Sequence, residues 1–211
     1  MEQTAPTTKT PPTQQLERRY NPEKAEYRAA ETGAPELFGY ALRFGSSYDM
    51  GWFTESVDRG ALEGADLTDV RVLFNHDSNI VLGRTKAGTA QVGIDDNGLW
   101  YRATLPDSPN GQNVKVALER GDVDQSSWGF YILSDTWEMR DGKDHRIIKR
   151  VGAVLDASAV TYPANPDTSA AKRSLEAAKT TTTELRPDMA ETYDLLSRSL
   201  HLKAAINNKQ I

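Results

Sequence analysis

The stretch Gln125-Ser126-Ser127-Trp128-Gly129-Phe130-Tyr131-Ile132-Leu133 places large apolar side chains at every second position, namely Trp128, Phe130 and Ile132. This alternation predicts a β-strand with one face in the core. Further short stretches rich in β-branched and aromatic residues are predicted as strands: Leu37–Phe44, Val70–Phe74, Ile80–Gly83, Thr89–Ile94, Leu99–Leu105, Thr136–Met139, Arg146–Lys149 and Val154–Thr161. Many short strands with few helices indicate a mainly β fold with flanking helices, a closed or partly closed β-barrel.

Two turns and one helix are predicted between these strands. Asp95-Asp96-Asn97-Gly98 and Asp141-Gly142-Lys143 have the composition of tight turns, so each is expected to join two strands as a hairpin. Ser108 and Pro109 form a typical helix start, and Gly121 is a typical helix end. A single core helix is therefore expected between them. Its apolar face would consist of Val114, Ala117 and Leu118.

The aromatic residues indicate one central domain with a tail at each end. All five Phe and all four Trp lie between positions 38 and 137. Residues 1–33 are predicted to form a flexible arm, because their Thr-, Pro- and Gln-rich beginning cannot bury enough apolar area to offset chain entropy. Within this arm, Leu16–Ala30 is expected to be transiently helical at most, since Asn21-Pro22 interrupts it. Residues 34–167 form the predicted domain.

The second tail, residues 168–211, is predicted to be helical with a Thr-rich linker. The Ala, Lys and Glu content of Ser169–Lys179 favours a helix, and the run Thr180–Thr183 is typical of a linker. Beyond it, apolar residues recur at helical spacing, which predicts an amphipathic helix from about Asp188 to Ile206. Such an apolar stripe either packs back on the domain or binds a partner. The stripe consists of Leu185, Met189, Tyr193, Leu196 and Leu200.

Composition argues against several classes of function. A net charge of -5 over 211 residues provides no basic surface for a phosphate backbone, so no nucleic-acid partner is expected. The absence of Cys removes disulfides, thiolate metal sites and a Cys nucleophile. With three His and no metal, phosphate-loop or dinucleotide motif, neither a metal nor a cofactor is expected. No apolar run has the length of a membrane span and no signal peptide is found, which predicts a soluble, non-secreted protein.

Three short islands supply the groups of a hydrolytic site in the order His, Ser, acid. They read Phe74-Asn75-His76-Asp77, then Ser126-Ser127-Trp128-Gly129-Phe130, then Asp156-Ala157-Ser158-Ala159-Val160-Thr161-Tyr162-Pro163-Ala164-Asn165-Pro166. A hydroxyl nucleophile needs a neutral imidazole to take its proton and a third group to fix the tautomer of that imidazole. The islands therefore predict a serine hydrolase.

Residue types alone leave alternatives open in the second island. Ser126 competes with Ser127 for the role of nucleophile. Gly129 has two interpretations, because a strand glycine either forms a bulge or lets another backbone, such as that of a substrate, approach closely.

The third role has more candidates. Asp156 follows two core residues, so its carboxylate needs a nearby donor, which an imidazole N–H would provide. His145 is interpreted as an exposed hairpin residue that remains an alternative for the third role. Ser158 and Thr161 are expected to satisfy local backbone groups. The competing acids are Asp77, Asp122 and Asp124.

The three islands, in this order, resemble the prohead maturation proteases of tailed bacteriophages, serine proteases of the herpesvirus-assemblin-like fold. The resemblance spans residues 36–167. It implies a barrel ringed by helices, with His76 as base, Ser127 as nucleophile and Asp156 as third member, where the family more often has Glu. Lesser matches are Leu37-Phe38-Gly39-Tyr40, Val81-Leu82-Gly83-Arg84, Gly98-Leu99-Trp100 and Leu105-Pro106-Asp107.

The resemblance also implies a setting and partners. It implies a serine endopeptidase that acts inside the prohead, in the bacterial host cytoplasm, on the scaffolding segment of the major capsid protein or on a separate scaffold, and then on itself. Relatives with this fold dimerise, so a homo-oligomer is expected. Two other classes stay open: a catalytically weak or inactive scaffold- or capsid-binding assembly protein, and an esterase, although the G-x-S-x-G motif of many esterases is absent.

Overall fold

The computed structural model describes residues 16–21, 25–29, 35–162 and 171–179. The chain divides into two compact units, Met1–Ala170 and Ala171–Ile211. In the second unit, residues 171–179 form a helix, as expected for Ser169–Lys179. The Thr180–Thr183 linker, the amphipathic helix from Asp188 to Ile206 and residues 1–15 of the arm lie outside the described residues.

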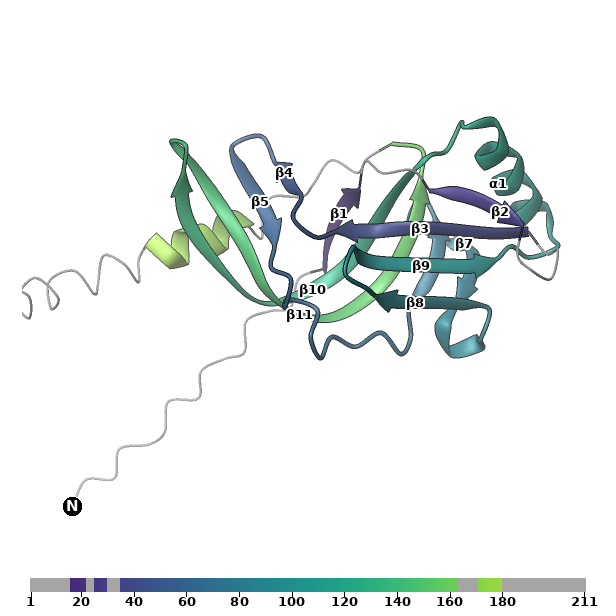
Figure 1. The fold of residues 1–211 in the computed structure, drawn as a ribbon, viewed down its shortest axis with the longest axis horizontal. Helices are drawn as coiled ribbons and strands as arrows, with labels where there is room; N and C mark the ends of the chain where they lie inside the picture. The colour runs from purple at the N-terminus through teal and green to yellow at the C-terminus, as the bar shows by residue number, and fades with distance from the viewer. Residues whose placement is uncertain (1–15, 22–24, 30–34, 163–170, 180–211) are drawn as a thin grey trace, which may run out of the picture. The chain divides into compact units, whose positions relative to one another are not determined.

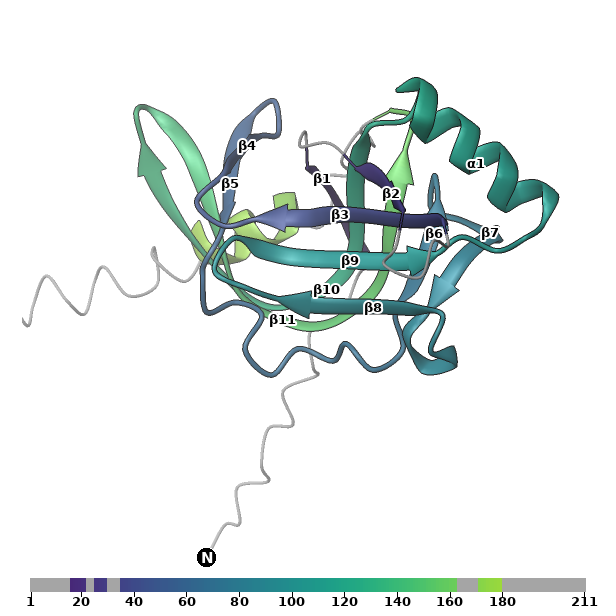
Figure 2. The same cartoon turned by 45° about the vertical axis from the view of Figure 1, so that its right-hand side comes forward.

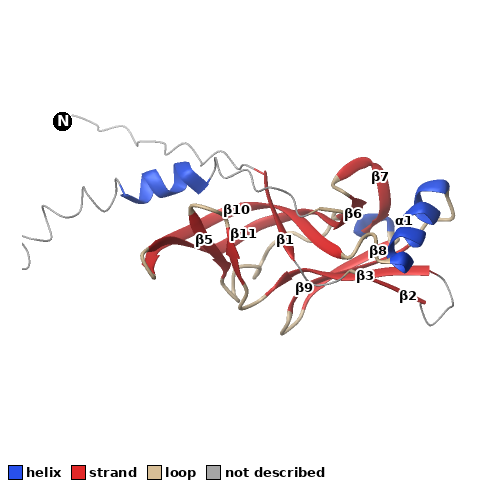
Figure 3. Cartoon of the chain, turned by 90° about the horizontal axis from the view of Figure 1, so that it is seen from above, coloured by secondary structure: helices blue, strands red, loops and turns tan. Residues whose placement is uncertain are grey.

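The first unit is built from two β-sheets in separate layers (Figure 1, Figure 3). The seven-stranded sheet contains β1 (Leu16–Asn21), β4 (Ser47–Asp49), β5 (Phe53–Val57), β6 (Arg71–Phe74), β7 (Asp77–Arg84), β10 (Gln125–Arg140) and β11 (Lys143–Val160). The four-stranded sheet has the order β2 (Glu26–Ala29), β3 (Pro35–Arg43), β9 (Gly98–Thr104) and β8 (Ala90–Ile94). Two short helices, η1 (Thr85–Ala87) and α1 (Pro109–Arg120), complete the described part of this unit.

The mainly β fold with flanking helices is confirmed. Among the described strands, hydrogen bonds form two sheets rather than one continuous closed barrel. Their facing sides share a core, in which the stacked rings of Trp128 and Phe130 from β10 have centroids 3.7 Å apart. Tyr101 of β9 and Leu37 of β3 are, like these two rings, fully buried.

The segment Leu16–Ala30 differs from its prediction, since it forms β1 and β2 rather than a transient helix. β1 runs antiparallel to β10, with Tyr20 opposite Ser127. Its alternation has period two, but Glu17 and Arg19 occupy buried positions. A hydropathy pattern therefore missed the strand, because polar residues stand where apolar ones are expected. Two segments of the predicted flexible arm are thus strands; the predicted domain boundaries otherwise stay a prediction.

The two longest strands of the seven-stranded sheet are β10 and β11. The four short strands predicted over residues 125–161 are in fact β10 and β11, joined by a tight turn at Asp141 and Gly142, both with positive φ. Register shifts after Gly129 and around Ile132 bend this pair. β11 also pairs in parallel with β5 along one part and with β6 along another. β4 and β5 were not predicted.

The predicted hairpin between β8 and β9 and the predicted core helix are both present. The Ser108 hydroxyl caps α1 by accepting from the Gly111 amide at 3.3 Å, and Gly121 ends the helix in the left-handed conformation. α1 lies near β7 (Figure 2). In the part of the chain that the structure describes, no helix is long and apolar enough to cross a membrane.

Candidate active site

His76 lies in the two-residue turn between β6 and β7. Phe74 pairs with Asp77 across this turn, and both central residues, Asn75 and His76, have positive φ, of 52° and 57°. Outside glycine this conformation is uncommon and costs free energy, so neighbouring contacts must hold it. The Asn75 side chain provides them, because its Oδ1 accepts from the Thr161 amide at 2.8 Å and its Nδ2 donates to Thr161 Oγ1 at 3.1 Å. The turn is thereby tied to the end of β11.

This turn brings together the three side chains that the islands supply. His76 Nε2 lies 2.7 Å from Ser127 Oγ, and His76 Nδ1 lies 2.5 Å from Asp156 Oδ1. Ser127 projects from β10 and Asp156 from β11, which are neighbouring strands. The imidazole is therefore bonded through one nitrogen to a hydroxyl and through the other to a carboxylate. A group of this geometry can take a proton from the hydroxyl.

The Asp156 carboxylate is held in a narrow space. Ser158 Oγ donates to its Oδ1 at 2.8 Å, whereas Ser158 was expected to bond backbone groups. The other carboxylate oxygen, Asp156 Oδ2, lies so close to Gly129 that a Cβ at position 129 would be only 2.4 Å from it. Gly129 thus makes room for the carboxylate, and the bulge interpretation agrees with the register shift that follows it. Close approach of a substrate backbone at Gly129 stays a prediction.

The Ser127 hydroxyl is fully buried and has a second hydrogen-bond acceptor besides His76 Nε2. Its Oγ also donates to the main-chain carbonyl of Arg19 in β1, at 3.0 Å. A hydroxyl carries one proton, so it cannot donate fully to this carbonyl and to His76 Nε2 together. In this conformation the two acceptors compete for the proton of Ser127.

Buried ion pairs fix β1 beside the site. The Arg19 guanidinium bonds both carboxylate oxygens of Glu55 and also Glu17 Oε2, the latter at 2.5 Å. Arg146 bonds the same two acids and Asp135. Burial alone would lower the pKa of Arg19, but the adjacent carboxylates of Glu55 and Glu17 outweigh it and raise that pKa. Each buried charge in this cluster is paired, which is what burial of charge requires.

The alternative residues have other contacts. The Ser126 hydroxyl lies 2.9 Å from the Tyr101 hydroxyl, on the opposite face of β10 from Ser127. Asp77 accepts from the Asn79 amide at 2.8 Å, and the Asp122 carboxylate pairs with Arg120 at 2.7 Å. Asp124 accepts through its main-chain carbonyl from the Ala25 amide.

His145 is buried, so its interpretation as an exposed hairpin residue is wrong. It lies in β11 opposite Glu138, and its ring lies between two hydroxyls of β5. Nδ1 is 2.6 Å from Thr54 Oγ1 and Nε2 is 2.9 Å from Ser56 Oγ. Burial, and then the charge of Arg140, lower the pKa of His145. Both ring nitrogens are thus engaged away from His76.

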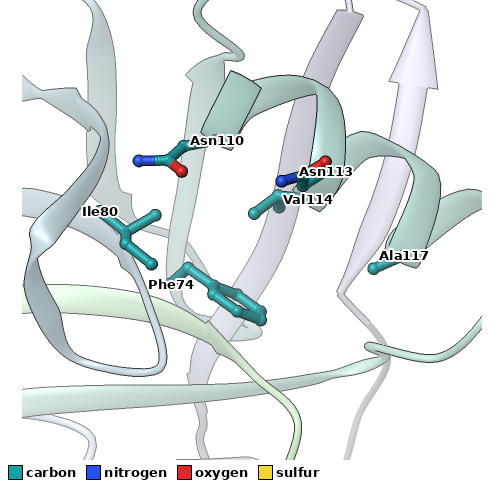
Figure 4. Close-up of a pocket in the computed structure, with 6 residues that line it drawn as sticks. All are labelled: Phe74, Ile80, Asn110, Asn113, Val114 and Ala117. Carbon is teal, nitrogen blue, oxygen red and sulfur yellow. The ribbon is translucent and has the colours of Figure 1, made fainter. Parts of the chain in front are cut away.

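A pocket of about 290 Å³ lies between the β6–β7 hairpin and α1 (Figure 4). Phe74 contributes its ring and pairs with Ala159, whereas Ser127 pairs with Ser158 one residue earlier. Successive strand residues point to opposite faces, so this pocket and the Ser127 hydroxyl lie on opposite faces of the sheet. The remaining lining residues are Ile80, Asn110, Asn113, Val114 and Ala117.

A mainly β unit with a bonded Ser, His and Asp is typical of a serine hydrolase, and comparison with known proteins narrows the class. The family model of the caudovirus prohead serine proteases matches residues 23–181, and the chain belongs to this peptidase family. It is 26% identical over 165 residues to the prohead protease of Enterobacteria phage HK97, covering 75% of this chain and 69% of that protein. Among solved structures, it is similar to the bacteriophage T4 capsid assembly protease, gp21. That similarity has a TM-score of 0.43 and 14% identity, over 68% of this chain and 97% of the other.

Proposed function

We propose that the chain is a serine endopeptidase with Ser127 as nucleophile, His76 as general base and Asp156 as the group that orients the base. Its membership of the prohead protease family supports peptidase activity. The single observation that supports these roles is the chain of contacts from Ser127 Oγ through the His76 ring to Asp156. The proposed protease domain is residues 34–167, extended to include β1 and β2.

The proposed reaction has two stages. Ser127 Oγ attacks the carbonyl carbon of the peptide bond while its proton passes to His76 Nε2, which then donates that proton to the leaving amine. Water, activated by the same imidazole, hydrolyses the acyl-enzyme. Asp156 stabilises the imidazolium that forms in each stage. Because Ser127 is buried and bonded to the Arg19 carbonyl, a substrate reaches Oγ only after a local opening, such as separation of β1 from β10.

The substrate follows from the family. Its members are named for the prohead, and the relative from phage HK97 is named a prohead protease. The proposed substrates are therefore capsid or scaffold proteins and the chain itself, inside the immature capsid. Co-assembly of enzyme and substrate in one shell gives a high local concentration, so cleavage does not need high affinity in solution.

The test is coexpression of the full chain with the capsid and scaffold proteins of its phage, followed by mass spectrometry of all three. The wild type should cleave at least one of them, and Ser127→Ala should cleave none. Ser126→Ala is the matched control, because it removes an equally buried hydroxyl from the neighbouring position of β10. Cleavage that survives in Ser127→Ala, or a wild type that cleaves nothing, would refute the proposal, and the latter would favour an inactive assembly protein.

A further inference from the structure

Ser158 has a contact that the roles assigned so far do not use. Its hydroxyl is fully buried on β11, directly across from Ser127 on β10. Three atoms meet there: His76 Nδ1, Asp156 Oδ1 and Ser158 Oγ. They are separated by 2.5 Å from nitrogen to carboxylate, 2.8 Å from hydroxyl to carboxylate, and 3.2 Å from hydroxyl to nitrogen.

Hydrogen-bond chemistry allows one consistent placement of protons in this triangle. An ionised carboxylate is only an acceptor, so both of its neighbours must donate to it. The single proton of the Ser158 hydroxyl is then committed to Asp156, and toward His76 Nδ1 the hydroxyl oxygen presents a lone pair. Nδ1 therefore faces two acceptors and must itself carry a proton.

The tautomer at Nδ1 decides the state of the other ring nitrogen. In a neutral imidazole, a proton on Nδ1 leaves Nε2 without one, as an acceptor. Nε2 lies 2.7 Å from Ser127 Oγ, so this is the tautomer that can receive the proton of Ser127. In the opposite tautomer Nε2 would carry a proton and donate it to Ser127 Oγ, so it could not receive the proton of Ser127.

From this geometry we infer that Ser158 is a positioning residue, which holds the Asp156 carboxylate and the His76 ring in the tautomer that can act as a base. The inference rests on the proposed function for its link to catalysis. With Gly129 leaving space for Oδ2 and Ser158 bonding Oδ1, both carboxylate oxygens have a defined place. Ser158 acts through Asp156 and touches no substrate.

The first experiment reads the tautomer directly by ¹⁵N NMR of histidine-labelled full chain, which has only three histidines. The wild type should show His76 protonated at Nδ1 and unprotonated at Nε2. Ser158→Ala should shift His76 toward a mixture of tautomers, whereas the equally buried Ser126→Ala should leave it unchanged. The signals of His145, bonded to Thr54 and Ser56, report whether the variant keeps its fold.

The second experiment is a double-mutant cycle on cleavage of the capsid or scaffold protein. Ser158→Ala should lower kcat by roughly 10- to 100-fold, the loss expected for one hydrogen bond to a charged group, with little change in KM. In an Asp156→Asn background the same substitution should change kcat by less than about 2-fold, because its route of action is already broken. Ser158→Cys, which keeps a weak donor, should fall between Ser158→Ala and wild type.

The inference is overturned if Ser158→Ala leaves the His76 tautomer unchanged, or if its effect on kcat is the same with and without Asp156. A variant that loses its fold is recognised by altered His145 signals, and Ser158→Cys then provides the comparison. The tautomer reading needs no substrate. A changed tautomer together with cleavage that survives in Ser127→Ala would therefore refute the proposed function and leave the positioning role intact.

Discussion

Replacing Gly129 by Ala should disable the candidate site while leaving the fold in place. A Cβ at this position would lie 2.4 Å from Asp156 Oδ2, whereas ordinary contact begins at 3.4 Å, so the carboxylate must retreat by about 1 Å. The 2.5 Å contact between Asp156 Oδ1 and His76 Nδ1 cannot survive such a shift unchanged. A misplacement of about 1 Å in a catalytic arrangement costs on the order of 10²-fold in rate, which is the expected loss.

The assay for Gly129→Ala is the rate at which a fluorophosphonate probe modifies Ser127, measured by intact mass. Gly152→Ala is the matched control, because it lies in β11 and the atoms nearest to its Cβ would belong to the Leu133 side chain, the first at 3.0 Å. Leu133 is 40% exposed and can move aside. Circular dichroism should match wild type for both variants. Full probe reactivity in Gly129→Ala would refute the role of the Asp156 carboxylate.

Two further predictions concern stability. Glu55→Ala should lower the free energy of unfolding by about 3–5 kcal/mol in urea titrations, because Arg19 and Arg146 lose a buried partner that they share. Glu138→Ala is the control and should lower it by less than about 1 kcal/mol, because the ion pair of Glu138 with Arg140 is half-exposed. Equal effects of the two substitutions would contradict the importance of the buried cluster. Burial lowers the pKa of His145 below its ordinary value of 6.5. As the pH falls below about 6.5, His145 therefore binds a proton more readily in the unfolded chain than in the folded one, and the stability of the fold should decrease. His145→Gln should flatten that decline in thermal melts, and an unchanged slope would exclude His145 as its source.

The candidate site was predictable to the extent that it depends on local sequence. His76, Ser127 and Asp156 stand in distinctive runs of residues, and each lies on or beside a strand that the sequence predicts. The role of Ser158 was missed, because its contact with Asp156 depends on how β11 is bent and on where the β6–β7 turn places the imidazole. No spacing along the chain encodes those distances. The burial of His145 was missed for a related reason, since it depends on the unpredicted strand β5.

Two of the strands that were missed, β1 and β5, share a physical cause. β1 is buried through Glu17, Arg19 and Asn21, and β5 through Glu55 as well as Phe53, so charged side chains occupy core positions that hydropathy assigns to the surface. Each such residue is stabilised by a partner on another strand, and pairing of that kind is visible only in three dimensions. The predicted strands β3 and β9 carry apolar residues at buried positions, which is why their pattern sufficed.

The pairing of β1 with β10 affects when, during synthesis of the chain, the contacts of the candidate site can form. The bond from the Ser127 hydroxyl to the Arg19 carbonyl joins residues 108 positions apart, and the bond from His76 to Asp156 joins residues 80 apart. Contacts this distant along the chain form late in folding, because long loops must close first. While β11 has not yet left the ribosome, the growing chain therefore has no assembled site. The order of the strands along the chain thus delays proteolysis until synthesis of the domain is nearly complete, before the chain meets any partner.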